Sequence, residues 1–101
     1  MATVRIEEHD DRLIVGIGGI LDIYAAKDVR VALGPALRTS RPIIDLDVTD
    51  VEEVDLAGVQ VLVWLRTTAQ ANGVAVHVVG SGAAVDSAAR SLCLLEWQVS
   101  P

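Results

Sequence analysis

The residues best suited to nucleophilic catalysis or metal binding are two histidines and one cysteine, His9, His77 and Cys93. A catalytic nucleophile needs a base within hydrogen-bond reach, and a zinc site needs several ligands, often at short spacings. No local spacing in this chain brings the three side chains together. We interpret Cys93 as a small apolar residue near a helix end and His77 as a strand residue. The sequence therefore predicts no catalytic residues, no metal site and no cofactor, and an enzyme is the least supported function.

Two patterns associated with phosphate chemistry are incomplete. Gly80-Ser81-Gly82 precedes an expected helix, where free N–H groups could hold an anion, but the lysine of a phosphate-binding loop is missing. We interpret this segment as a tight turn. A phosphoacceptor-aspartate receiver domain would need an acidic pair after its first strand and a lysine on a late strand. Here Asp10-Asp11 lies in an expected hairpin and the only lysine is Lys27, so that interpretation fails.

An acidic segment precedes the most apolar part of the chain. Residues 45–55 contain no Lys or Arg, and their six acidic residues are Asp45, Asp47, Asp50, Glu52, Glu53 and Asp55. Such a run is usually a solvated loop. This run, however, leads directly into Asp55-Leu56-Ala57-Gly58, and loops held by rigid elements often carry recognition residues. A solvated loop and a partner-binding loop are both open on composition alone.

Length and charge narrow the class of protein. The chain has 101 residues, 51% of them apolar, and a formal net charge of −6. This length predicts one domain over residues 1–101 with its own core. An acidic chain with few basic residues is unsuited to nucleic-acid phosphates and anionic lipids. One cysteine, no membrane-spanning run and no evident signal peptide predict a cytoplasmic protein.

Hydrophobic periodicity predicts strands alternating with amphipathic helices. The expected strands are residues 3–7, 13–17, 43–46, 74–79 and 95–99, and the expected helices begin near Ala25, Val59 and Ser81. The first two strands form a hairpin, after which Gly18-Gly19 breaks the pattern. Residues 47–53 are expected to be a polar connection. This order predicts an α/β fold in which helices pack against a sheet.

The helix boundaries follow from local signals. Gly34-Pro35 predicts a kinked first helix or two short pieces, because proline removes a backbone hydrogen bond. Residues 59–65 have the β-branched content of a strand, but the length of the segment favours a helix that ends at Asn72-Gly73. That helix is apolar on nearly all sides, which favours deep burial over an oligomer surface. Ser81 is the expected N-cap of the last helix, whose apolar face is Val85, Ala88, Ala89 and Leu92.

Three segments, taken in order, resemble the STAS domain, a family named for sulfate transporters and anti-sigma factor antagonists. They are Gly19-Ile20-Leu21-Asp22, Ile43-Ile44-Asp45-Leu46 and Val54-Asp55-Leu56-Ala57-Gly58-Val59. The resemblance runs from about Val4 to Leu95 and preserves order and spacing. It implies a mixed β-sheet flanked by α-helices, and it implies that residues 59–65 are helical.

The resemblance also implies a function in binding. Stand-alone bacterial members of the antagonist type bind an anti-sigma factor, a kinase with a GHKL-type ATP site, and so release a sigma factor for transcription. The partner-binding residues that the resemblance implies here are Asp22, Asp55, Leu56, Ala57, Gly58 and Gln60. The net negative charge then predicts a partner face rich in Lys or Arg, with association slowed by salt.

The chain departs from the family at the residue that the kinase modifies. The family pattern is Asp-Ser-[Ser/Thr/Ala]-Gly, and phosphate on its hydroxyl adds about −1.5 to −2 charge at a helix start. Here Leu56 and Ala57 occupy the two candidate positions, while Asp55 and Gly58 match the pattern. The resemblance therefore predicts an intact turn without a phosphoacceptor.

Other roles remain open within the same resemblance. Asp22 aligns with an early family aspartate near the acceptor turn, and it is equally suited to cap the helix near Ala25. Some small STAS proteins resemble accessory subunits that bind the ATPase of ABC-type lipid transporters, and Ala57-Gly58 fits that form equally well. A scaffold in a sensory assembly, with self-association, is a third possibility.

Overall fold

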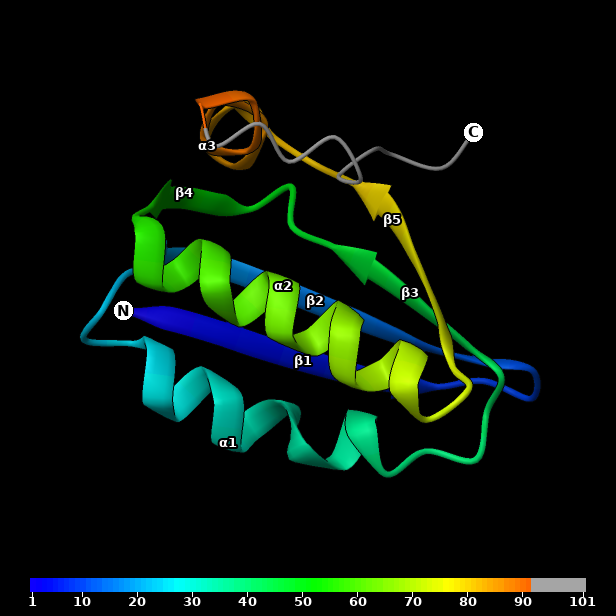
Figure 1. Ribbon diagram of the computed structural model, residues 1–101. Helices are drawn as coiled ribbons and strands as arrows, with labels where there is room; N and C mark the ends of the chain where they lie inside the picture. Colours follow the sequence, from blue (N-terminus) through cyan, green and yellow to red (C-terminus); the bar gives the residue numbers. More distant parts are fainter. Residues whose placement is uncertain (92–101) are drawn as a thin grey trace.

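A computed structural model describes residues 1–91 as a five-stranded mixed sheet with three helices (Figure 1). The strands are β1 (Ala2–Glu8), β2 (Arg12–Leu21), β3 (Ile43–Asp47), β4 (Val51–Val54) and β5 (Ala75–Gly80). The helices are α1 (Ala26–Leu37), α2 (Leu56–Ala71) and α3 (Ala83–Ser91). The predicted α/β class, with a mixed sheet flanked by helices, is confirmed. Among the described residues, no helix is long and apolar enough to cross a membrane.

Strand β2 is the centre of the sheet. It pairs antiparallel with β1 along one edge, which confirms the predicted hairpin. Along its other edge it pairs in parallel with β3 over its first half and with β4 near its end. Strand β5 extends the sheet in parallel beyond β3. The carboxyl end of β2 therefore lies beside β4 and the start of α2, where the candidate site is found.

Helices α1 and α2 lie side by side on one face of the sheet, and α3 packs beside β4 (Figure 1). Alternate strand residues point toward the helices, as the period of two predicts. The core that they form includes Leu13, Val15, Ile17, Val29, Leu33, Ile44, Leu46, Leu62, Leu65 and Val76. The opposite sheet face carries polar side chains such as Arg5, Arg12 and His77.

Two strand predictions were wrong. Gly18-Gly19 does not end β2, which continues to Leu21 because pairing with β1 and β4 holds it. Gly19 has φ +83, and a Cβ there would overlap the Met1 carbonyl oxygen, so glycine permits a bulge inside the strand. The predicted polar connection after β3 contains β4, because Val51 is buried and the segment pairs with β2.

The helix predictions fared better. The segment around 59–65 is helical, as predicted, and α2 begins three residues earlier, at Leu56. Helix α1 is one helix and not two short pieces, and Pro35 lies in its last turn, so the helix ends two residues after the proline. Ser81 is not an N-cap: Gly82 precedes α3, and the Ser81 hydroxyl donates to the Asp86 carboxylate at 2.7 Å. The predicted strand at 95–99, Leu92 and Cys93 lie outside the described residues.

Candidate functional site

Asp55 joins two separate segments at one end of the molecule. It is the N-cap of α2, with Oδ1 accepting a 2.9 Å hydrogen bond from the Gly58 backbone N–H. Its other oxygen, Oδ2, accepts a 3.0 Å bond from the N–H of Ile23, in the loop that follows β2. One carboxylate therefore caps a helix and holds a loop that is distant in sequence.

Asp22 organises that loop from within. Its Oδ1 accepts hydrogen bonds of 3.0 Å from the N–H groups of both Tyr24 and Ala25. Its carbonyl oxygen accepts bonds from Ala25 and Ala26. Helix α1 begins at Ala26 and has no side-chain cap at Ala25, so Asp22 caps the turn that leads into the helix. The same loop is held by Asp55 through Ile23, so Asp22 orders a loop that lies against the start of α2.

Gly58 lets the start of α2 approach the end of β2. A Cβ at this position would overlap the Leu21 carbonyl oxygen and would lie 2.7 Å from Cγ2 of Val54. The Asp55 N–H donates to the same Leu21 oxygen at 3.3 Å. Gly58 therefore has a packing role and is buried beneath the surface that its neighbours form.

Three large apolar residues are exposed around this junction. Ile23 is 65% exposed, Tyr24 90% and Leu56 58%. Ala57 is half-buried and Gln60 is exposed one turn further along α2. We call these five residues the loop–helix surface. Apolar side chains held in solvent by a rigid turn are typical of a protein-binding surface.

The six predicted partner-binding residues thus gather at one end of the fold but differ in exposure. Leu56, Ala57 and Gln60 are accessible, whereas Gly58 is buried. Asp22 and Asp55 use their carboxylates to accept backbone N–H groups, so their part in the site is to position it. Sequence reasoning missed Ile23 and Tyr24, although two large apolar residues directly after an Asp could have drawn attention.

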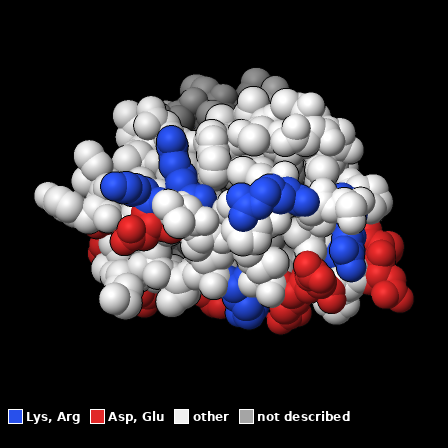
Figure 2. All heavy atoms as spheres, turned by 90° about the horizontal axis from the view of Figure 1, so that it is seen from below, with Lys and Arg blue, Asp and Glu red and all other residues white. Residues whose placement is uncertain are grey.

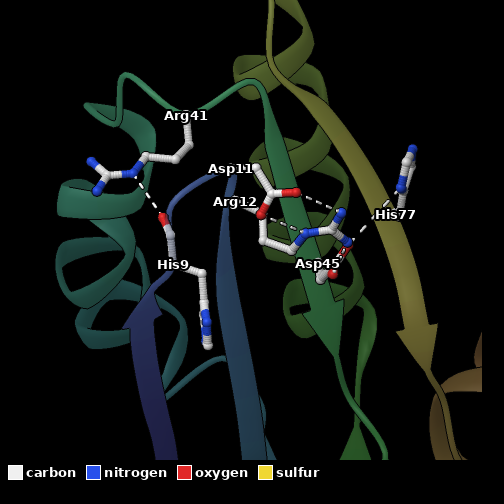
Figure 3. Close-up of polar contacts among 6 residues, drawn as sticks. All are labelled: His9, Asp11, Arg12, Arg41, Asp45 and His77. Carbon is white, nitrogen blue, oxygen red and sulfur yellow. Dashed lines mark hydrogen bonds and ion pairs between the residues drawn. The ribbon is translucent and has the colours of Figure 1, made fainter.

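The acidic segment does not form one loop. Asp45 and Asp47 lie on β3, and Asp45 is buried on the sheet face away from the helices. Figure 3 shows Arg12 between Asp11 and Asp45, with Nη1 donating to Asp45 Oδ2 at 2.8 Å. Asp50, Glu52, Glu53 and Asp55 are exposed, and Glu52 and Glu53 lie on β4. The acidic residues are therefore spread over two strands and the turns beside them.

Arg12 also affects how nearby groups ionise. Its guanidinium donates hydrogen bonds to Asp11, which lowers the pKa of that carboxyl. Bonds to Asp11 and Asp45 raise the pKa of Arg12. His77 Nδ1 lies 3.9 Å from Asp45 Oδ1, an oxygen without a hydrogen bond (Figure 3). His9 is in the hairpin turn, where its carbonyl accepts from Arg41 Nε at 3.1 Å.

Neither histidine lies in a group that could bind a metal. Within residues 1–91, no three His, Cys, Asp or Glu side chains are grouped closely enough to hold an ion. His9 and His77 lie on different parts of the fold, and Cys93 falls outside the described residues.

Asp47 provides a pH-dependent contact near this end of the sheet. Thr49 donates to Asp47 Oδ1 through its hydroxyl at 2.6 Å and through its N–H at 3.0 Å, and the hydroxyl bond is the main reason for the lowered pKa of Asp47. A lowered pKa in the folded state stabilises the protein above the ordinary pKa of 3.8, and this stabilisation is lost as pH falls through the folded value.

Replacing Thr49 by Val should therefore make stability less dependent on pH below about pH 5. Removing the hydroxyl raises the pKa of Asp47 toward its ordinary value, which reduces the stability lost on acidification. Urea unfolding across this range measures the effect, with Thr67→Val on the exposed face of α2 as the control. An unchanged pH dependence in Thr49→Val would contradict the prediction.

Comparison with known proteins adds a family and several fold relatives. The family model described as "Mlab, STAS domain" matches residues 4–95. An anti-sigma factor antagonist from Mycobacterium paratuberculosis is 23% identical with a TM-score of 0.81, covering 100% of this chain and 86% of that chain. SpoIIAA in its unphosphorylated form is 15% identical with a TM-score of 0.76, covering 98% and 89%.

A third solved structure is an antisigma-factor antagonist STAS domain from Rhodobacter sphaeroides. It is 21% identical with a TM-score of 0.69, covering 80% of this chain and 86% of that chain. Among curated proteins, no relative matches the sequence. At these identities the structural likeness establishes the fold, and the family match covers nearly the whole chain.

Proposed function

The chain belongs to the STAS domain family, and from this premise we propose that it is a regulatory protein-binding module of the anti-sigma factor antagonist type. Its partner would be an anti-sigma factor kinase with a GHKL-type ATP site, bound in the cytoplasm of a bacterium. In this proposal residues 1–101 form one STAS domain. Several fold relatives are anti-sigma factor antagonists by description, which supports this kind of function.

The observation that carries the proposal is the two-sided role of Asp55. By accepting from Gly58 and Ile23, it holds the start of α2 and the preceding loop as one rigid unit. That unit presents Ile23, Tyr24 and Leu56 to solvent. A preformed apolar surface loses little conformational entropy on binding, which suits recognition of a folded partner.

We propose further that this antagonist lacks the usual kinase switch. The Bacillus relative SpoIIAA is known in a phosphorylated form. In the present chain the phosphoacceptor positions hold Leu56 and Ala57, and residues 50–60 contain no Ser, Thr or Tyr. Leu56 also replaces a polar side chain with an apolar one, which favours a contact that excludes water. A complex formed through this surface would not be dissociated by phosphorylation of these positions.

Incubation with a cognate kinase and ATP should leave residues 50–60 of the natural protein unmodified. An Ala57→Ser variant should accept phosphate at residue 57, since the turn around it is intact. Mass spectrometry of proteolytic fragments measures both results, and Leu56→Ser tests the other candidate position. If the kinase modifies neither variant while remaining active on another substrate, the antagonist proposal loses its support.

Affinity capture from the native cell's lysate at low salt tests the partner itself. The natural protein should retain a GHKL-type kinase, identified by mass spectrometry. A Leu56→Glu variant should lose it, because the change puts a charge in the centre of an apolar contact. The matched control is Gln70→Glu, an equal charge change on the exposed C-terminal half of α2. Retention by Leu56→Glu would contradict the proposed surface.

A second candidate partner is the ATPase of an ABC-type lipid transporter. The description of the matching family model, "Mlab, STAS domain", favours it, whereas the Ala57-Gly58 pair fits both candidates equally well. The same capture experiment distinguishes the two, because it would recover an ABC ATPase in place of a kinase. The loop–helix surface would then serve lipid transport.

A further inference from the structure

A shallow, open apolar groove lies on the outward side of α2, is lined by residues of that helix alone and starts at the loop–helix surface. Its volume is about 400 Å³, and its lining residues are Leu56, Val59, Gln60, Val63, Trp64, Thr67 and Thr68. Val63 is 40% exposed and Trp64 is partly buried. The opposite side of α2 packs into the core through Val61, Leu62 and Leu65. The apolar character of α2 thus has two causes, burial on one side and an open groove on the other.

One edge of this groove is basic. The Arg30 guanidinium of α1 lies 5.3 Å from the centre of the Trp64 ring, in a cation–π contact. Lys27, one turn earlier on α1, is exposed. Residues 26–42 carry a net charge of +3 in a chain whose net charge is −6. Figure 2, seen from the α1 side, shows basic side chains across this face and acidic ones toward its edges.

We propose that this groove binds an amphipathic helix of the protein partner, with acidic residues of that helix facing Arg30. The inference rests on the proposed function and names the chemistry of the segment that the partner would place there. Between Leu56 and Thr68 the groove spans about 18 Å, the length of roughly three helical turns. Helix-in-groove recognition uses this combination of an apolar seam and a charged flank.

The positive charge of Arg30 beside the groove predicts a different ligand from the one that the net charge of the protein attracts. A protein of net charge −6 attracts cationic peptides at long range. Arg30, however, is held against Trp64, so a helix bound in the groove would cover its guanidinium and remove the water that solvates it. A carboxylate of the bound helix would then have to replace the hydrogen bonds of that water. Preference for an acidic helix would therefore come from contact within the groove, because the net negative charge of the protein favours a basic helix.

Two synthetic amphipathic peptides of about 15 residues provide the test. They share one leucine seam and differ only in flanking residues, Glu in one and Lys in the other. The Glu peptide should bind about tenfold more tightly, a difference of about 1.4 kcal/mol. Its titration, followed by NMR, should shift the signals of Val63, the Trp64 indole and Thr67. Trp64→Phe assigns the indole signal.

Charge reversal locates the preference. Arg30→Glu should reverse the order of the two peptides, whereas Arg38→Glu, an equal charge change at the other end of α1, should preserve it. Arg30→Gln should abolish the preference and serves if Arg30→Glu does not fold. Tighter binding of the Lys peptide to the natural protein would overturn the proposal, as would equal effects of Arg30→Glu and Arg38→Glu.

Two further results separate this inference from the proposed function. If Leu56→Glu abolishes capture of the kinase while Arg30→Glu leaves that capture unchanged, only the groove proposal is overturned. Groove binding of the Glu peptide without capture of any kinase would overturn the proposed partner alone. Concentration-dependent dimerisation that Arg30→Glu abolishes would assign the groove to a second copy of this chain and overturn the proposal.

Discussion

Replacing Gly58 by Ala should lower the free energy of unfolding by about 3 kcal/mol, because the added methyl group would overlap neighbouring atoms that cannot move aside. The added methyl group would overlap the Leu21 carbonyl oxygen and press on Val54. Both neighbours belong to strands that pair with each other, so relief requires α2 to move away from the sheet. Helix propensity alone would make the substitution stabilising by about 1 kcal/mol. The sign of the measured change in stability therefore shows whether the steric overlap outweighs helix propensity.

Urea unfolding followed by circular dichroism measures this loss. Gln70→Ala, on the exposed side of the same helix, is the matched control and should change stability by only a few tenths of a kcal/mol. Gly58→Ala should also weaken capture of the partner, because the start of α2 carries Leu56. A Gly58→Ala protein as stable as the natural one would show that α2 and β2 do not approach as closely as described.

Replacing Asp55 by Ala should cost about 2 kcal/mol of stability, from loss of the helix cap and of the charged bond to the loop. Gly58 and Ile23 each lose the oxygen that their N–H groups use. The loss is not confined to α2, because the loop after β2 is released as well. Amide hydrogen exchange at Ile23 should accelerate, reporting that release directly.

Asp55→Ser separates the two contributions. A serine hydroxyl still caps the helix through Gly58 but offers no second oxygen to Ile23, so it should restore only the cap's share of the stability and should leave exchange at Ile23 fast. Asp28→Ala, at an exposed aspartate in the first turn of α1, is the control for removing one negative charge. If Ile23 exchanges equally slowly in Asp55→Ala, the loop is held by other contacts.

Both predictions concern residues that the family pattern placed in the site. Their structural roles, a helix cap and a close packing contact, were not part of that reasoning. Asp55 and Gly58 were recognised because they match the family pattern, and Asp22 because it aligns with an early aspartate. The cap by Asp55 is a local feature, which short-range spacing can predict. The packing of Gly58 against Leu21 is not, because it depends on how the carboxyl end of one strand meets a helix far along the chain.

The errors have one physical origin. Strand β4 and the extension of β2 past Gly19 are stabilised by pairing between strands, which periodicity within a segment does not report. Asp45 lies in the strand expected at residues 43–46, but the sequence pattern did not reveal its partner. In the fold it pairs with Arg12, a residue 33 positions away, on the face of the sheet opposite the helices.

The sequence by itself determined the α/β class, the hairpin, the helix around residues 59–65 and the absence of a hydroxyl between Asp55 and Gly58. Each of these depends on residue type or on spacing within a few residues. Only the tertiary structure decided that Ile23 lies against Asp55 and that Arg30 covers Trp64. Contacts of this kind arise when elements distant in sequence pack together, and they shape the surface that a partner would meet.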